Sequence, residues 1–172
     1  MGAQRYIRLY RASLIILFLA LVIFFYGPAR AQNPDNRKAV KEAIVKQPEI
    51  FIQPAVFDFG KVSKRKAFLS ANFKLTNKGK AILLVRNIRS LCGCLTVSYQ
   101  TKGQITPYFG TEGAPLGWLA QLKPGETAQL AALLNLKHSS IKKGKLYREA
   151  EIVSNDPLNP VIAIRLAAQV RD

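Results

Sequence analysis

Histidine, cysteine and acidic residues are scarce in this sequence, and this scarcity excludes most kinds of active site. The chain holds one histidine, two cysteines and 10 acidic residues, against 26 lysines and arginines. With a single histidine and no Gly-x-Ser-x-Gly motif, a serine hydrolase triad has no support. No glycine-rich loop suited to a phosphate group occurs either. The sequence therefore predicts a protein that is not an enzyme and has neither catalytic residues nor a cofactor.

The excess of positive charge extends over the whole chain. Residues 1–31 contain four arginines and no acidic residue, which leaves 22 basic and 10 acidic residues, a net charge of +12, on residues 32–172. Such a charge favours an anionic partner: nucleic acid, anionic lipid, a cell-wall polymer or an acidic protein surface. The N-terminal segment argues against nucleic acid, because it directs the chain out of the cytosol.

A hydrophobic segment follows an arginine-rich start. Residues 1–11 contain three arginines, and residues 12–27 carry no charge. This order is typical of a signal peptide, or of a membrane anchor whose N-terminus stays in the cytoplasm. We expect residues 1–31 to form one hydrophobic helix in the bacterial inner membrane, with the rest of the chain in the periplasm. The alternative is cleavage after Ala31, which would release a soluble periplasmic protein.

Hydrophobic and polar residues alternate from residue 50 onward, after a polar and basic tether at residues 32–49. A period of two is typical of half-buried strands, and turn-forming residues separate the predicted strands. About seven strands and no convincing long helix predict an all-β fold, an antiparallel immunoglobulin-like sandwich over residues 50–172. The positions expected to face the core are Ala67, Leu69, Ala71, Phe73 and Leu75, then Ala128, Leu130, Ala132, Leu134 and Leu136, then Ala150 and Ile152, and finally Ile162, Ile164, Leu166, Ala168 and Val170.

Five short motifs occur in order along this domain. They are Phe57-Asp58-Phe59-Gly60-Lys61-Val62, Leu75-Thr76-Asn77-Lys78-Gly79, Ser90-Leu91-Cys92-Gly93-Cys94, Lys123-Pro124-Gly125-Glu126 and Ser154-Asn155-Asp156-Pro157. Together they resemble a bacterial family of unknown function, which is similar to the sandwich domains of major sperm protein, pilus chaperones and ciliary proteins. The resemblance implies an immunoglobulin-like fold and a binding or scaffolding role. Leu91 and Leu95 depart from the family pattern, which usually has Ser and Thr beside the cysteine pair.

Cys92 and Cys94 are the only cysteines, and a single glycine separates them. Residues i and i+2 of a strand point to the same face, so a disulfide is possible, although strained and easily reduced. Two thiolates are also suitable ligands for a soft metal such as Cu(I) or Zn(II). The simplest interpretation is a tight turn at Gly93 with its thiols packed or bridged, and a metal or thiol-redox site is the alternative.

Two basic clusters fall at predicted hairpin tips. Loops of this kind are often merely solvated, but they are also suited to contact with anionic lipid headgroups or an acidic protein surface. Association through them should weaken as salt screens the charges. The clusters consist of Lys64, Arg65 and Lys66, and of Lys142, Lys143 and Lys145.

A segment at about residues 102–121 is longer than the family pattern requires and carries three aromatic residues. Long loops without secondary structure are mostly functional or disordered, and Trp and Tyr are enriched at interface hot spots. We therefore expect Tyr108, Phe109 and Trp118 to form a docking surface for a protein partner. The alternative is that Trp118 folds back and plugs an open end of the sandwich.

These observations favour a non-catalytic, membrane-tethered binding or scaffold module that acts outside the cytoplasm as an accessory or assembly subunit of a membrane protein complex. The expected partners are other membrane or periplasmic proteins, the membrane itself through the N-terminal helix, and anionic lipid. One alternative is a periplasmic metal or thiol-redox carrier that uses Cys92 and Cys94. Another is a protein that binds an anionic wall polymer.

Overall fold

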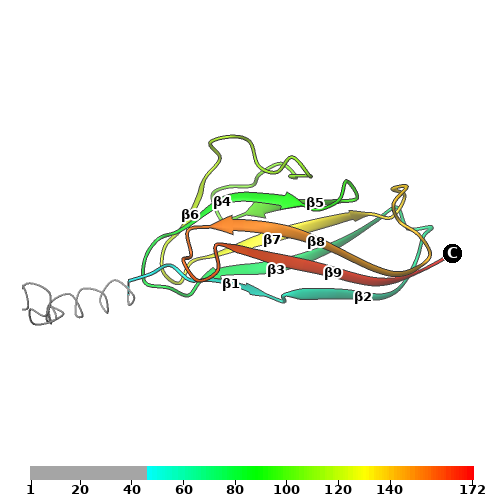
Figure 1. Cartoon of the computed structure of the whole chain (residues 1–172), viewed down its shortest axis with the longest axis horizontal. Helices are drawn as coiled ribbons and strands as arrows, with labels where there is room; N and C mark the ends of the chain where they lie inside the picture. The colour runs from blue at the N-terminus through cyan, green and yellow to red at the C-terminus, as the bar shows by residue number, and fades with distance from the viewer. Residues whose placement is uncertain (1–45) are drawn as a thin grey trace, which may run out of the picture. The chain divides into compact units, whose positions relative to one another are not determined.

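The computed structural model describes residues 46–172, in which nine strands form two packed sheets (Figure 1). The predicted N-terminal helix and residues 32–45 of the predicted tether lie outside the described residues. Residues 46–172 contain no helix long and apolar enough to cross a membrane. The strands are β1 (Ile50–Gln53), β2 (Val56–Ser63), β3 (Phe68–Asn77), β4 (Leu83–Ser90), β5 (Leu95–Gln100), β6 (Ala120–Leu122), β7 (Thr127–Asn135), β8 (Gly144–Ser154) and β9 (Val161–Arg171).

The order of the strands within each sheet is that of an immunoglobulin domain. The first sheet has the order β1-β3-β7-β5, and the second has the order β2-β9-β8-β4-β6. In immunoglobulin letters, the first sheet contains strands A, B, E and D, and strands C, F and G are neighbours in the second. The predicted all-β, immunoglobulin-like sandwich is therefore confirmed for the described residues.

Two details of the prediction are wrong. The described residues form nine strands rather than about seven, because the chain passes from the first sheet to the second at Gln53–Pro54, and because β6 lies within the insertion. Pro54 has no N–H to offer to a sheet, so it separates β1 from β2. The sandwich is also not wholly antiparallel, since β2 pairs with β9 in parallel. Hydrophobic alternation shows which face of a strand is buried but not the direction of its neighbour.

The predicted inward-facing positions form the core of the sandwich. Phe73 and Leu75 of β3, Leu130 of β7, and Ile152 and Ile164 of the second sheet are fully buried. Ala67 is exposed, because it precedes β3 and belongs to the turn that follows β2. With this exception and the half-buried Ile162, every predicted core position is buried.

Residues 47–49 are already bonded to the domain. The backbone N–H groups of Lys78 and Lys80 donate to the carbonyl oxygens of Glu49 and Gln47, each at 2.9 Å. A β-carbon on Gly79 would collide with the backbone of residues 47–49. The close passage of this segment therefore explains why the turn after β3 has glycine at position 79.

The sandwich has two ends with different contents. One end holds residues 46–49 together with the turns at 78–82, 123–126 and 155–160. The opposite end holds the turn at 64–67, the loop at 136–143 and the C-terminus (Figure 1). The loop at 91–94 also lies at this second end, where Asn135 donates a backbone hydrogen bond to Cys94.

Candidate functional site

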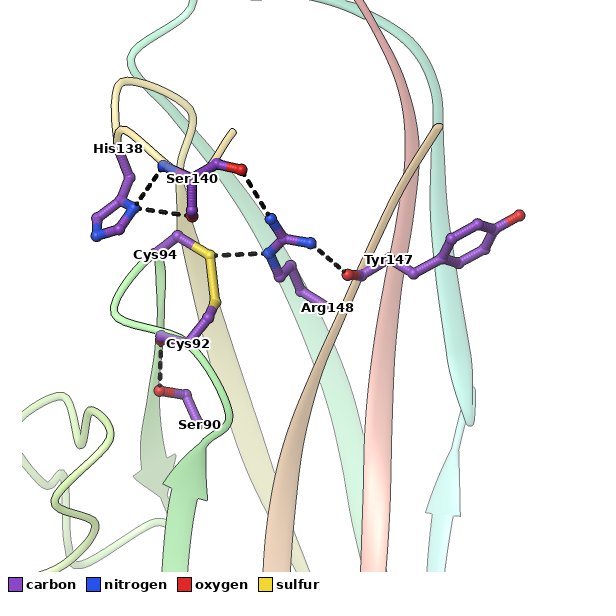
Figure 2. Close-up of a disulfide and its surroundings, with 7 residues drawn as sticks. All are labelled: Ser90, Cys92, Cys94, His138, Ser140, Tyr147 and Arg148. Carbon is purple, nitrogen blue, oxygen red and sulfur yellow. Dashed lines mark hydrogen bonds between the residues drawn. A yellow bond between two sulfur atoms is a disulfide. The ribbon is translucent and has the colours of Figure 1, made fainter. Parts of the chain in front are cut away.

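Cys92 and Cys94 form a disulfide in the loop that carries the chain from β4 of the second sheet to β5 of the first (Figure 2). Their Cα atoms are 5.3 Å apart. Ser90 supports the loop, since its hydroxyl donates to the Cys92 carbonyl at 2.9 Å. Of the states that the sequence left open for the two thiols, the structure contains the bridged one.

The two sulfur-bearing residues differ in exposure. Cys94 is 1% exposed and belongs to the core, whereas Cys92 is only partly buried. Arg148 Nε donates a hydrogen bond to Cys94 Sγ at 3.0 Å. The disulfide therefore joins a buried cysteine, whose sulfur contacts a cation, to a cysteine that is more exposed.

Arg148 reaches this position because it faces inward from β8. Its neighbours on the same face, Leu146 and Ala150, are buried, and Arg148 itself is half-buried. Its Nη1 donates to the Tyr147 carbonyl at 2.7 Å and its Nη2 to the Ser140 carbonyl at 3.2 Å (Figure 2). This residue is not among those predicted from the sequence, although a charged side chain at an inward position of an alternating strand is a detectable signal.

His138 lies beside the glycine between the cysteines. A β-carbon on Gly93 would lie 3.2 Å from His138 Nε2. The Ser140 N–H donates to His138 Nδ1 at 3.2 Å. Nδ1 is therefore an acceptor, and a neutral ring carries its proton on Nε2, the atom that faces Gly93.

Leu91 and Leu95, the two departures from the family pattern, have different surroundings. Leu95 is fully buried in the core, and Leu91 is 53% exposed. The Leu91 N–H donates to the Glu149 carbonyl at 3.0 Å, which keeps the loop against β8. The change at position 95 thus contributes to packing, and the change at position 91 adds an apolar side chain to the surface beside the disulfide.

The fold brings the two predicted basic clusters together at one end. Lys64 Nζ donates to the carbonyl oxygen of Ile141 at 3.0 Å, and the fully buried Ile141 holds this second loop to the core. We call residues 63–67, 137–145 and 171–172 the basic end. Among these residues Asp172 is the only acidic one, and it pairs with Lys143. The basic residues of this end, all exposed except the half-buried Lys64, are Lys64, Arg65, Lys66, Lys137, Lys142, Lys143, Lys145 and Arg171.

The insertion covers the free edge of β5. Val97 and Phe109 exchange two backbone hydrogen bonds, at 2.9 and 2.8 Å. The Thr106 N–H donates to the Tyr99 carbonyl at 3.0 Å, and the Tyr99 N–H donates to Thr106 Oγ1 at 2.9 Å. These bonds satisfy an edge that would otherwise be open to pairing with another chain. Part of the predicted loop is thus an ordered cover for the sheet.

Two of the three predicted docking aromatics face inward. Phe109 is 4% exposed, and Trp118 packs against the core. The Trp118 ring lies edge-on to Phe109 and to Tyr99, with centroids 5.3 and 5.7 Å apart. The expected surface of three exposed aromatics is therefore not formed, because Trp118 folds back onto the core; closure of an open end of the sandwich by Trp118 stays a prediction. Tyr108 is 50% exposed, and partner binding there stays a prediction.

This aromatic cluster contains two buried polar atoms without a hydrogen-bond partner, Tyr99 Oη and Trp118 Nε1. Burial, with a smaller contribution from the negative charge of Glu126, raises the pKa of Tyr99 to about 12. Buried polar groups without partners are destabilising. The cluster therefore stabilises the domain by apolar packing, and its two unpartnered polar atoms lower the stability. Replacement of Tyr99 or Trp118 by a residue without the polar atom would remove that destabilising contribution.

Two further observations concern the rest of the described surface. A shallow hollow of ≈ 640 Å³ on the first sheet is lined mainly by polar residues, among them Asn72, Lys74 and Gln129. It contains none of the predicted site residues. Within residues 46–172, no group of three or more histidine, cysteine and acidic side chains is arranged to hold a metal ion.

Residues 50–110 match the family described as "Protein of unknown function (DUF1573)". The matched segment includes Cys92 and Cys94 and ends before Trp118. Whether the Cys-Gly-Cys sequence is a signature of the family stays a prediction. No curated protein matches the chain.

Three solved structures are similar to the chain at low sequence identity. A protein of unknown function from Porphyromonas gingivalis W83 is 16% identical, with a TM-score of 0.54 over 73% of this chain and 48% of that protein. The chain thus spans about half the length of that relative. A PapD-like domain of human CEP192 is 11% identical, with a TM-score of 0.45 over 74% of this chain and 88% of that domain. The YadV chaperone is 14% identical, with a TM-score of 0.45 over 72% of this chain and 52% of that protein.

Proposed function

We propose that this chain is a non-catalytic module that binds an acidic surface of another protein outside the cytoplasm, through the basic end of its sandwich. The N-terminal hydrophobic segment holds the module at the bacterial inner membrane. The observation that carries the proposal is the joining of two basic loops, far apart in the sequence, at one end of the domain.

The charge at this end is not neutralised within the domain. Of the eight basic residues at the basic end, Lys143 pairs with an acidic side chain, the exposed C-terminal Asp172. By contrast, Arg89 and Arg165 on the outer face of the second sheet pair with Glu151 and Glu149. A concentration of one charge sign steers an oppositely charged partner and raises the rate of association.

The surroundings of the basic end favour a protein over a lipid surface. Leu91 and Tyr147 lie beside it and are 53% and 66% exposed. Protein interfaces combine apolar and aromatic side chains of this kind with arginine and a polar rim. In addition, residues 46–49, through which the N-terminal segment joins the domain, lie at the opposite end of the sandwich.

A pair of charge-reversal variants tests this proposal. Arg65→Glu with Lys142→Glu changes the basic end, and Lys80→Glu with Lys123→Glu makes the same change in net charge on exposed residues at the opposite end. Each full-length variant is purified from membranes in mild detergent, and the co-purifying proteins are identified. We expect acidic proteins to co-purify with the wild type and with the opposite-end variant but not with the basic-end variant. The basic-end variant should associate with these proteins about tenfold more slowly than the wild type. The same set of proteins with all three chains would contradict the proposal.

Two controls separate the proposal from its alternatives. Replacement of Cys92 and Cys94 by Ser should leave partner binding intact, because the proposed binding surface does not include the cysteine pair. Loss of binding by a folded variant would mean that binding itself depends on the thiols. Protease added outside spheroplasts should digest the domain, because the proposal places it outside the cytoplasm. Complete protection in intact spheroplasts, with digestion after lysis, would overturn that placement.

A further inference from the structure

The disulfide has an asymmetry that the binding function does not require. Cys92 is partly exposed at the end of the sandwich, while Cys94 is 1% exposed. A thiolate attacks the sulfur that it can reach, so an incoming thiol meets Cys92 first. The departing sulfur is then Cys94.

Arg148 lies where the departing sulfur becomes negative. Its Nε is 3.0 Å from Cys94 Sγ, and two backbone carbonyls hold the other guanidinium nitrogens (Figure 2). A neutral disulfide sulfur is a weak acceptor and benefits little from a cation. A thiolate at the same place benefits strongly, through a charge-assisted hydrogen bond in a partly buried site. Arg148 therefore favours the reduced state of Cys94 over the oxidised one.

Arg148 is a half-buried cation that contacts the loop at Ser140 as well as Cys94. Leu146, Ala150 and Ile152 on the same face of β8 belong to the core, and no carboxylate of residues 46–172 pairs with Arg148. Burying a charge in part is unfavourable unless a partner compensates for it. The Cys94 sulfur and the two carbonyl groups are the partners that the structure provides.

We propose that Cys92–Cys94 is an exchangeable disulfide that oxidises a dithiol of a partner protein, with Cys92 as the attacked sulfur and Cys94 as the leaving group stabilised by Arg148. One thiol of the partner loses its proton to solvent, and the resulting thiolate attacks Cys92 Sγ. An intermolecular disulfide forms, and the Cys92–Cys94 bond breaks with its electron pair on Cys94. The partner's second thiol loses its proton to solvent and attacks the partner's own sulfur in the mixed disulfide, which releases Cys92 as a thiolate. The partner loses two electrons and two protons, and Cys92 and Cys94 gain the two electrons.

This activity is independent of the proposed function, because exchange with a small dithiol needs no docked partner. The test uses the full-length chain in detergent with dithiothreitol as the probe. Reduction is followed by trapping free thiols with iodoacetamide at timed intervals and counting them by mass spectrometry. We expect the wild type to be reduced while folded, and Arg148→Gln to be reduced about tenfold more slowly, since the cation that stabilises the leaving thiolate is absent.

Two further variants keep the result specific to charge. Arg148→Lys retains a cation and should recover part of the rate. Arg89→Gln removes an arginine from the neighbouring strand β4, where it pairs with Glu151, and should leave the rate unchanged. Melting curves show whether each variant folds. A wild-type rate for Arg148→Gln, or reduction that occurs only after denaturation, would overturn the proposal.

The asymmetry has its own test, which does not depend on Arg148 variants folding. In Cys94→Ser the remaining Cys92 should form a mixed disulfide with oxidised glutathione. In Cys92→Ser the remaining Cys94 should react more than tenfold more slowly, because it is buried. Equal rates, or a faster reaction at Cys94, would show that the assignment of attacked and leaving sulfur is wrong.

Discussion

Replacement of Trp118 distinguishes a side chain that closes the sandwich from one that docks a partner. Trp118 packs against the core and contacts Phe109 and Tyr99, whereas Tyr108 of the same insertion is 50% exposed. Because Trp118 is packed and Tyr108 is exposed, Trp118→Ala should destabilise the domain, and Tyr108→Ala should not.

The magnitude follows from the burial of the ring. Loss of a fully buried Trp typically costs about 3–5 kcal/mol. Trp118 is only partly buried, and its Nε1 has no hydrogen bond to lose. We therefore expect a loss of about 2 kcal/mol, which lowers the melting temperature of a domain of this size by about 6–10 °C.

Thermal melting by circular dichroism of the full-length chain measures the effect. Trp118→Phe is the matched control, because it keeps an aromatic ring beside Phe109 and Tyr99 and should retain most of the stability. Tyr108→Ala should change the stability by less than about 0.5 kcal/mol. An unchanged melting temperature for Trp118→Ala, together with lost partner binding, would refute the packing role and restore the predicted docking role.

Three other predictions concern stability. Tyr99→Phe should raise stability by about 1 kcal/mol, because it removes a buried hydroxyl without a partner; a lower melting temperature would show that the hydroxyl is bonded. Gly79→Ala should cost about 2 kcal/mol or more, because its β-carbon meets the backbone of residues 47–49, while Gly103→Ala has open space and should cost far less; equal effects would exclude a steric role. Burial alone would raise the pKa of Asp156, but hydrogen bonds donated by Ile50, Leu158 and Asn159 lower it overall. The contribution of the Asp156 carboxylate to the free energy of unfolding should therefore be complete above about pH 4, the unfolded pKa, and be lost on further acidification. The stabilities of the wild type and Asp156→Asn should then converge in acid. A difference in stability that stays constant down to pH 2 would contradict this.

The core of the domain could be predicted from the sequence, because each strand gives a local signal. Alternation along Leu69–Leu75 and along Ala128–Leu136 determines which side chains face inward, and the structure buries them. The four-residue β1 and the three-residue β6 are too short to show a period. The parallel pairing of β2 with β9 joins segments more than 100 residues apart, which no local pattern reports.

The candidate sites could be predicted only as separate motifs. The cysteine pair and both basic clusters are visible in the sequence, but their common location depends on the fold. The burial of Phe109 depends on a backbone pairing with Val97 that its own neighbours do not indicate. Arg148 was missed because its charge suits a solvated strand face, although its place in the alternation marks an inward position.

Site-specific photocrosslinking in intact cells tests the central claim, that the basic end binds an acidic protein, most directly. A photoreactive amino acid is placed at Lys142 of the basic end or, as the control, at Lys80 of the opposite end, both exposed. We expect a discrete protein adduct from position 142 that weakens when the salt concentration is raised in spheroplasts, and no such adduct from position 80. Equal adducts from both positions, or adducts from position 142 that consist only of lipid, would contradict it.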